Sequence, residues 1–340
     1  MKRTILYVVL AFIVAPIFVS CYQSHKKELD LAYALVESRP DSALALMKHI
    51  DQEGLSKEEM AKYALTYYIA QDKSGLDLDN DSLIRIAYDW YEGHQEDSLY
   101  VLCLNYMGKF YLLVDSMEQA KSCLEKAYFI SDSLHKMNVK RLVLDKLIEV
   151  EEQLEPYKAL RYAKDMLKMY DSMANVTIYN KVAARLRLGE NFFYVGSLQH
   201  ALEEERKAYR MAMKAGDSNL LSYVRQNLAS TFEEMGEKDS CLYYARLAYD
   251  LNAANRFSCL LTFASAYISV DSLNQAFSLL NQALPKTAED RYSVFYFQSQ
   301  AAMKAQDFKS AKSFSDSAYH YLEDMYRTAL QGKAAYYTSF

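Results

Sequence analysis

The chain has 340 residues, of which 51% are hydrophobic, so it is long and apolar enough to bury a core. It carries 39 basic and 44 acidic side chains, a net charge of −5 at pH 7. An acidic balance disfavours nucleic acid as a partner, because affinity for nucleic acid comes largely from neutralising phosphates. The sequence contains only 9 Gly and 4 Pro and has no alternating Val/Ile-rich runs, which favours an all-α fold.

The first twenty residues are predicted to be a signal peptide rather than part of the fold. Lys2 and Arg3 give a basic start, the run 5–14 is apolar and uncharged, and small residues precede Cys21. An apolar run of this length is too short to span a bilayer and is typical of a secretory leader. Residues 1–20 are therefore assigned to the leader and residues 21–24 to an anchor segment.

The end of this leader resembles that of bacterial lipoproteins, in which a cysteine is acylated and becomes the mature N-terminus. The likeness rests on Val19, Ser20 and Cys21, whereas Phe18 departs from the usual Leu. The resemblance implies a lipid such as palmitate on Cys21, with each buried CH₂ contributing about 0.8 kcal/mol to membrane binding. It also implies an outer-membrane anchor facing the periplasm, since no Asp and no acidic run follow the cysteine. The alternatives are an ordinary signal peptide with a chance cysteine, or an uncleaved anchor.

Helical periodicity predicts about eight antiparallel hairpins over residues 25–325, followed by a C-terminal helix or tail at 326–340. The expected fold is a right-handed α-α superhelix, or solenoid. The paired helices are expected near 25–38 and 41–51, 57–71 and 81–92, 97–113 and 117–130, 138–153 and 156–171, 177–194 and 198–214, 219–235 and 239–251, 256–269 and 272–284, and 289–304 and 308–323.

A spaced pattern of small residues recurs in these hairpins. A small residue is followed by Ala or Cys twelve positions later and by Ala seven further on, with an aromatic residue three after the first. A fixed spacing across two helices indicates one hairpin used repeatedly. The sets are Gly108, Ala120 and Ala127; Gly189, Ala201 and Ala208; Ala229, Cys241 and Ala248; Ala264, Ala276 and Ala283; and a degraded set at Ser299, Ala311 and Ala318.

Two further expectations concern turns and cysteines. Recurrent Asp-Ser pairs, such as those starting at Asp115, Asp217 and Asp271, are predicted to cap helix N-termini with their side chains. The remaining cysteines are predicted to be four buried thiols, because the repeat does not bring suitable pairs together. They are Cys103, Cys123, Cys241 and Cys259.

The pattern around Leu104, Met107, Gly108 and Tyr111, with Ala120 and Ala127, resembles a tetratricopeptide repeat. The family's Trp is absent at the matching places, Leu104, Arg185 and Arg225. With its lipoprotein-like start, the chain is similar to tetratricopeptide lipoproteins of the Bacteroides group. Some of those are sensors that continue into a membrane helix and a DNA-binding module. The membrane helix and DNA-binding module of those sensors are expected to be absent here, since no later stretch is apolar enough to span a membrane.

The resemblance implies that a peptide or protein binds in the groove lined by the first helix of each hairpin. Amide, charged and tyrosine side chains suit such a role, because they can hold an extended backbone, pair with a carboxylate and provide contact area. The candidates are Asn105, Lys109, Leu112, Arg187, Glu190, Tyr194, Tyr223, Gln226, Ser230, Glu233 and Tyr296. An ordinary solvated surface is the alternative interpretation of these positions.

The sequence contains no pattern that indicates catalysis, a cofactor or a metal. Its six His are dispersed, and it has no glycine-rich phosphate loop. The segment 77–81 imitates a calcium loop but lacks the required Gly and terminal Glu. The run 203–205, three Glu, is interpreted as a solvated helix face. We therefore expect a non-enzymatic scaffold of the cell envelope that binds a protein or peptide, with a glycan-binding lipoprotein or the sensor half of a signalling system as alternatives.

Overall fold

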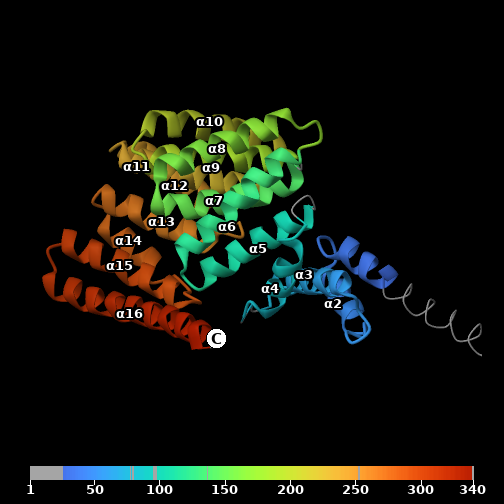
Figure 1. The fold of residues 1–340 in the computed structure, drawn as a ribbon. Coiled ribbons are helices and arrows are strands. Elements are labelled where there is room, and N and C mark those ends of the chain that lie inside the picture. Colours follow the sequence, from blue (N-terminus) through green and yellow to red (C-terminus); the bar gives the residue numbers. More distant parts are fainter. Residues whose placement is uncertain are drawn as a thin grey trace, which may run out of the picture. The chain divides into compact units, whose positions relative to one another are not determined.

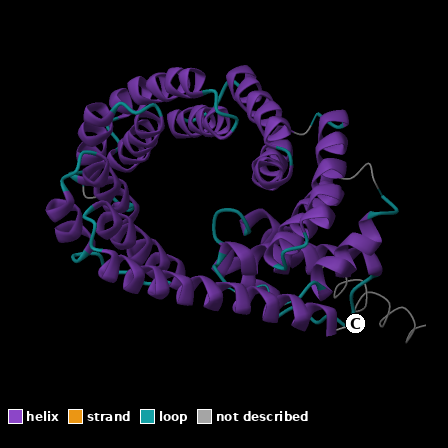
Figure 2. Ribbon diagram, turned by 90° about the vertical axis from the view of Figure 1, so that its left-hand side faces the viewer, coloured by secondary structure: helices purple, strands orange, loops and turns teal. Residues whose placement is uncertain are grey.

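A computed structural model describes residues 26–338, except 77, 79, 95–97, 136 and 252. Across these ranges the chain consists of helices and turns, without strands (Figure 2). The predicted leader and Cys21 lie outside the described residues, as do parts of the segment that imitates a calcium loop. The predicted all-α solenoid of antiparallel hairpins is confirmed.

The chain divides into two compact units, Met1–Lys146 and Leu147–Phe340. In the first unit a helical stretch at 26–35 precedes the labelled helices, and α7 continues across the boundary. These helices are α2 (Pro40–Met47), α3 (Lys57–Lys73), α4 (Ser82–Tyr91), α5 (Ser98–Leu113), α6 (Met117–Ser133) and α7 (Met137–Leu154).

In the second unit, α9 pairs with α10, α11 with α12, α13 with α14 and α15 with α16 (Figure 1). The first helices α9, α11, α13 and α15 also contact one another in sequence, so they form a continuous layer. The helices are α8 (Pro156–Ser172), α9 (Ile178–Tyr194), α10 (Leu198–Ala215), α11 (Ser218–Glu234), α12 (Lys238–Tyr249), α13 (Arg256–Ser269), α14 (Leu273–Leu280), α15 (Ala288–Lys304) and α16 (Phe308–Thr338).

The predicted helix bounds agree with the structure to within a few residues, with one large exception at the C-terminus. Helix α16 does not end near residue 323 but continues to Thr338. The added stretch contains no Pro and a single Gly, so nothing in it breaks a helix. The last hairpin therefore has a second helix of 31 residues beside a first helix of 17.

The recurring small residues allow the two helices of a hairpin to approach each other. A Cβ added to Gly108 would lie 2.6 Å from Cγ of Leu124, which is fully buried. The corresponding Ala and Cys positions of the other sets are also buried, including Ala201, Cys241 and Ala276. The packing role assigned to the spacing is confirmed.

The repeat also fixes the turn between its two helices. The residue seven positions after the first small residue has a positive φ in all five sets, and the next backbone N–H donates to the carbonyl of the residue five earlier. This closes the first helix with a left-handed turn of the Schellman type. The left-handed residues are Asp115 (φ 54°), Gly196 (74°), Gly236 (75°), Asp271 (61°) and Gln306 (59°).

This turn explains why the prediction for the Asp-Ser pairs was largely wrong. Asp115 and Asp271 end the first helix in left-handed conformation, and Ser116 and Ser272 make no side-chain cap bond. Asp217 does cap α11, accepting from the amide of Leu220 at 2.9 Å. Asp tolerates the left-handed region, so the pair marks the end of a helix as readily as the start of the next.

The cysteines agree with expectation except for one. Cys103, Cys241 and Cys259 are buried thiols, whereas Cys123 is only partly buried and corrects the prediction of four buried groups. Burial raises the pKa of Cys241 to about 12 and that of Cys123 to about 11. Both side chains are therefore uncharged at neutral pH and act as small packing groups.

Candidate functional site

The predicted groove residues of the first unit are largely occupied by the fold itself. Asn105 is buried at 5% exposure, so it is not part of an open surface. Lys109 forms an ion pair with Asp72 of α3, and Leu112 is partly buried. In this unit Lys109 therefore joins α5 to α3, while Asn105 is buried and Leu112 is partly buried.

In the second unit, most polar candidates belong to a ladder of hydrogen bonds between successive first helices. Asn227 on α11 donates to Glu190 on α9 at 2.9 Å. Ser265 on α13 donates to Glu233 on α11 at 2.7 Å. Gln226 accepts from Asn255 at 3.0 Å. These bonds join residues about one repeat apart, so they fix the spacing of the layer that would line the groove.

Arg187 extends this ladder towards α7. Its guanidinium lies 3.4 Å from a carboxylate oxygen of Glu152 and 3.7 Å from one of Glu190. Asn191 also donates to Glu152, at 2.9 Å. Burial raises the pKa of Glu152, while Arg187 and Asn191 act in the opposite direction. Arg187 is thus held between two carboxylates.

Three tyrosines among the candidates remain exposed. Tyr194, Tyr223 and Tyr296 are 57%, 45% and 43% exposed. Tyr296 stacks on Tyr292, with ring centroids 6.0 Å apart and planes inclined by 26°. These rings offer contact area that the fold does not use.

A pocket of about 280 Å³ opens between α9 and α11. It contains three predicted residues, Glu190, Tyr194 and Ser230. On both helices the lining positions are spaced i, i+3 and i+4, which places them on one helix face. We call it the Glu205 pocket, after the residue that α10 contributes; its lining is Glu190, Phe193, Tyr194, Glu205, Asn227, Ser230 and Thr231.

Glu205 corrects the interpretation of the Glu203–Glu205 run as a solvated face. Glu203 is exposed, but Glu204 and Glu205 are 8% and 1% exposed. Glu205 Oε1 accepts a hydrogen bond from Thr231 at 2.7 Å, whereas Oε2 is buried without a partner. Burial raises the pKa of Glu205 to about 7. The small size of Gly189 makes room for this side chain, since a Cβ there would lie 3.2 Å from Cγ of Glu205.

Sequence reasoning therefore missed four of the lining residues. Asn227 and Thr231 could have been found, because Asn227 lies three positions before Ser230 and Thr231 lies four positions after Asn227, which puts each near the pocket-facing side of α11. Phe193 precedes Tyr194 on α9. Glu205 had no signal of its own in the sequence, because it lies on the second helix of its hairpin.

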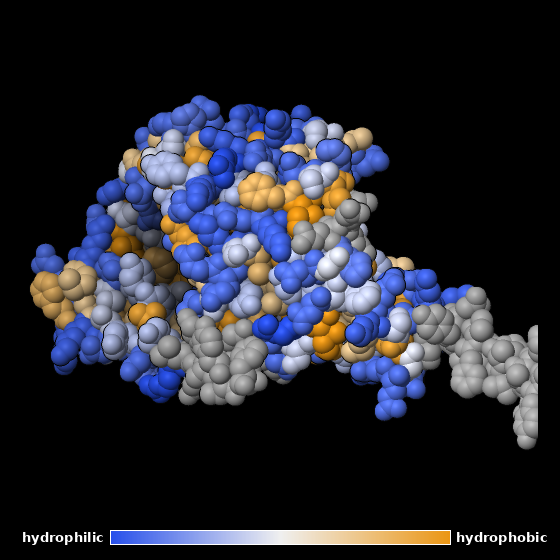
Figure 3. All heavy atoms as spheres, viewed as in Figure 1, coloured by the Kyte–Doolittle hydropathy of each residue, from blue (hydrophilic) through white to orange (hydrophobic). Residues whose placement is uncertain are grey.

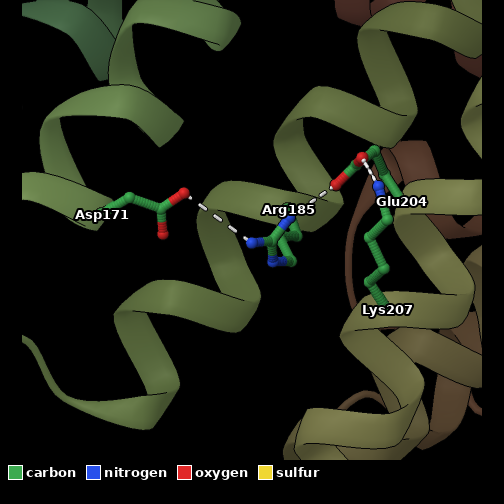
Figure 4. A network of polar contacts seen from close by, with 4 residues as sticks. All are labelled: Asp171, Arg185, Glu204 and Lys207. Atoms are coloured by element: carbon green, nitrogen blue, oxygen red, sulfur yellow. Dashed lines mark hydrogen bonds and ion pairs between the residues drawn. The ribbon is translucent and has the colours of Figure 1, made fainter.

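The neighbouring Glu204 belongs to a different network, which includes Arg185 at the place of the missing tryptophan of the repeat (Figure 4). Arg185 lies at the Trp-equivalent place of α9 and donates to Glu204 at 2.8 Å. It also lies 3.8 Å from Asp171 on α8, while Lys207 contacts Glu204 at 2.5 Å. A chain of alternating charges thus links α8, α9 and α10 at the position where the repeat family has a tryptophan.

Figure 3 shows how hydrophilic and hydrophobic residues are distributed over one face of the molecule. Hydrophilic residues cover most of this face, with hydrophobic ones scattered among them. Scattered exposed apolar residues are normal for a soluble surface. Within the described ranges, no cluster of three or more His, Cys, Asp and Glu is placed to hold a metal ion. None of the helices described is both long and apolar enough to cross a bilayer.

Comparison with known proteins gives the fold but not a family. No protein-family model and no curated protein matches the chain. Among solved structures, the apo form of RapI matches 88% of this chain and 86% of its own, with a TM-score of 0.67 and 14% identity. The match to a Rap protein complexed with competence and sporulation factor covers 92% of this chain and 94% of that protein's chain, with a TM-score of 0.62 and 15% identity.

A third similar structure is a signal transduction ATPase with a tetratricopeptide repeat sensor from Pyrococcus horikoshii. It matches 92% of this chain and 49% of its own, with a TM-score of 0.61 and 13% identity. At these identities the likeness concerns the fold alone. The fold is therefore that of a tetratricopeptide-like helical repeat protein, as the resemblance in sequence implied.

Proposed function

We propose that the protein is a non-enzymatic scaffold of the cell envelope that binds a protein or peptide partner along the first helices of its second unit. The observation that carries this is the layer formed by α9, α11 and α13. Its polar side chains are cross-linked by hydrogen bonds. Tyr194, which lines the Glu205 pocket, and Tyr223, one helical turn before Asn227 on α11, remain exposed. A rigid layer with free aromatic and polar groups suits recognition of an extended chain. The similarity in fold to a Rap protein complexed with competence and sporulation factor supports the proposal.

The proposed location rests on the leader sequence. A lipid on Cys21 would hold the repeats at the outer membrane, facing the periplasm. Labelling cells with radioactive palmitate should mark the protein and not a Cys21→Ser variant, which should leave the membrane fraction. Equal labelling of both proteins, or equal membrane retention, would contradict the anchor.

Binding is tested by placing a photo-crosslinking amino acid at single tyrosines in the lipidated protein in cells. We expect a protein adduct from Tyr194, which lines the pocket, and from Tyr223, which is exposed one helical turn before Asn227 on α11. Tyr157 on α8 is the control, since it is 76% exposed but lies outside the layer of first helices proposed to bind the partner. Adducts of the same kind and yield at all three positions, or none at the first two, would oppose the proposal.

A glycan-binding lipoprotein is the second candidate. The stacked pair Tyr292 and Tyr296 favours it, because an exposed aromatic face can stack on a sugar ring. If soluble glycans compete for binding and Tyr296→Ala removes it, while no protein adduct forms at Tyr194 or Tyr223, this candidate replaces the first.

A further inference from the structure

The Glu205 pocket combines two carboxyl groups with two aromatic walls. Glu190 comes from α9 and Glu205 from α10, while Phe193 and Tyr194 line the same pocket. We infer that this pocket receives one basic side chain, a lysine or an arginine, of the protein or peptide partner. The inference rests on the proposed function and gives that function its chemical specificity.

The first argument is the unpartnered oxygen of Glu205. The side chain is 1% exposed, and its Oε2 has no hydrogen-bond partner among the described residues. Burying a polar atom without a partner is unfavourable, and the cost is largest for a charged group. An ammonium or guanidinium group would supply the missing donor and the opposite charge in one contact.

The second argument is the charge around the pocket. Burial raises the pKa of Tyr194, and the negative charges of Glu152 and Glu190 raise it further, while Arg187 acts in the opposite direction. The cation facing them is Arg187, which is placed between Glu152 and Glu190, at 3.4 and 3.7 Å. Because this one guanidinium lies beside these two carboxylates, the negative charge of Glu205 is left without a compensating cation in the described part of the chain. The pocket therefore favours a cation over a neutral or anionic group.

The third argument is size and lining. A volume of about 280 Å³ lies just below the usual range for small-molecule sites, so it suits one long side chain. Phe193 and Tyr194 can cover the methylene stem or stack on a guanidinium plane. Ser230 lines the same pocket; its hydroxyl donates to the carbonyl of Gln226 at 3.2 Å and can still accept from an N–H of the partner's backbone.

The experiment is a selection of phage-displayed random dodecapeptides on the purified full-length protein in detergent. The selected peptides are synthesised, and their affinities are measured by fluorescence anisotropy. We expect them to share a Lys or Arg whose replacement by norleucine or citrulline weakens binding at least tenfold. Glu205→Gln and Glu190→Gln should each weaken the parent peptide about tenfold, while Glu203→Gln, an exposed neighbour, should change it less than twofold.

The same measurement shows whether the loss arises at the pocket. On Glu205→Gln protein, replacing the basic residue of the peptide should cost less than it does on the wild type, because the partner carboxylate is gone. Thermal unfolding shows whether each variant is folded, and Glu190→Gln gives a second test at a half-exposed position. Selected peptides without a required basic residue, or with undiminished affinity for both variants, overturn this inference and leave the proposed function standing. Failure to select any peptide, together with no protein adduct at Tyr194 or Tyr223, overturns both.

Discussion

Thr231 on α11 donates its hydroxyl hydrogen to Glu205 on α10 at 2.7 Å, across the contact between two successive hairpins. Both side chains are 1% exposed, and the second carboxyl oxygen of Glu205 has no partner. A single neutral donor does not compensate for removing a carboxylate from water. Burial therefore raises the pKa of Glu205 from 4.5 to about 7, and this makes the hairpin contact sensitive to pH.

The first prediction concerns this sensitivity in the unliganded protein. The folded pKa of Glu205 lies above the unfolded value, so the folded state binds the proton more tightly. The stabilisation that comes from protonated Glu205 is fully present below about pH 4.5, and it is lost as the pH rises through about 7. The side chain of the Glu205→Gln variant cannot ionise. Between pH 5 and pH 8, the free energy of unfolding of this variant should therefore fall by up to about 3 kcal/mol less than that of the wild type. Urea unfolding at both pH values measures this difference.

Glu203→Gln provides the matched control for this prediction. Glu203 is exposed, so its substitution should leave the pH dependence of the wild type unchanged. Parallel curves for the wild type and Glu205→Gln would show that Glu205 is ionised in the folded protein without cost. That outcome would contradict the raised pKa.

The acidic run at residues 203–205 shows how far sequence reasoning reaches. Successive helix residues point about 100° apart, so three consecutive Glu cannot share one face. Glu203 is exposed, whereas Glu204 bonds Arg185 and Glu205 bonds Thr231. Those partners lie 19 and 26 residues away, and the sequence does not show which distant residues will meet.

The spacing of small residues predicted the fold well, because it reflects how closely the backbones of two paired helices approach each other. It predicted the paired helices, and the same register also contains the left-handed turns at Asp115 and Gln306. Whether the groove candidates are open to a partner depends instead on the contacts that their side chains make. The pattern placed Glu190 and Glu233 on first helices, but their bonds to Asn227 and Ser265 follow from the contact between hairpins.

The second prediction concerns the close approach of α5 and α6. Gly108→Ala places a Cβ 2.6 Å from Cγ and 2.9 Å from Cδ2 of Leu124. The branch carbon of a fully buried leucine cannot move aside easily, so we expect a loss of about 1–3 kcal/mol of stability. Leu124→Ala alone should cost about 2–5 kcal/mol. The double variant should cost less than the sum, because each change relieves the other.

Gly189→Ala serves as the comparison for this prediction. Its added Cβ would lie 3.2 Å from Cγ of Glu205 and 3.4 Å from the carbonyl oxygen of Ala201, a milder contact. It should therefore destabilise less than Gly108→Ala in chemical denaturation. Equal effects of the two changes, or strict additivity with Leu124→Ala, would show that the approach at Gly108 is not limiting.

The third prediction tests the left-handed turn at the end of α15. Gln306 has a φ of 59°, which costs a residue with a Cβ roughly 1–2 kcal/mol. Gln306→Gly should remove that cost and stabilise the protein by up to about 1 kcal/mol, after the entropy of the unfolded chain is included. The same substitution at Gln300, exposed within α15, should destabilise by about 1 kcal/mol. Thermal unfolding of the two variants should give shifts of opposite sign, and shifts of the same sign would contradict the turn.

The fourth prediction concerns the charged network at the place of the missing tryptophan. Arg185→Leu leaves Glu204, whose side chain is 11% exposed, with Lys207 as its remaining ion pair. Because that pair still compensates part of the buried charge, we expect a loss of about 1–3 kcal/mol, below the usual cost of breaking a buried pair. Adding Glu204→Leu should restore most of the loss, since a buried ion pair often contributes no more than apolar packing. Lys158→Leu, which breaks the exposed pair with Glu155, should stay within about 1 kcal/mol of the wild type. Urea denaturation of the wild type and the three variants measures their free energies of unfolding. Two outcomes would show that the network does not replace the indole: Arg185→Leu loses as little stability as Lys158→Leu, or the double variant is less stable than Arg185→Leu alone.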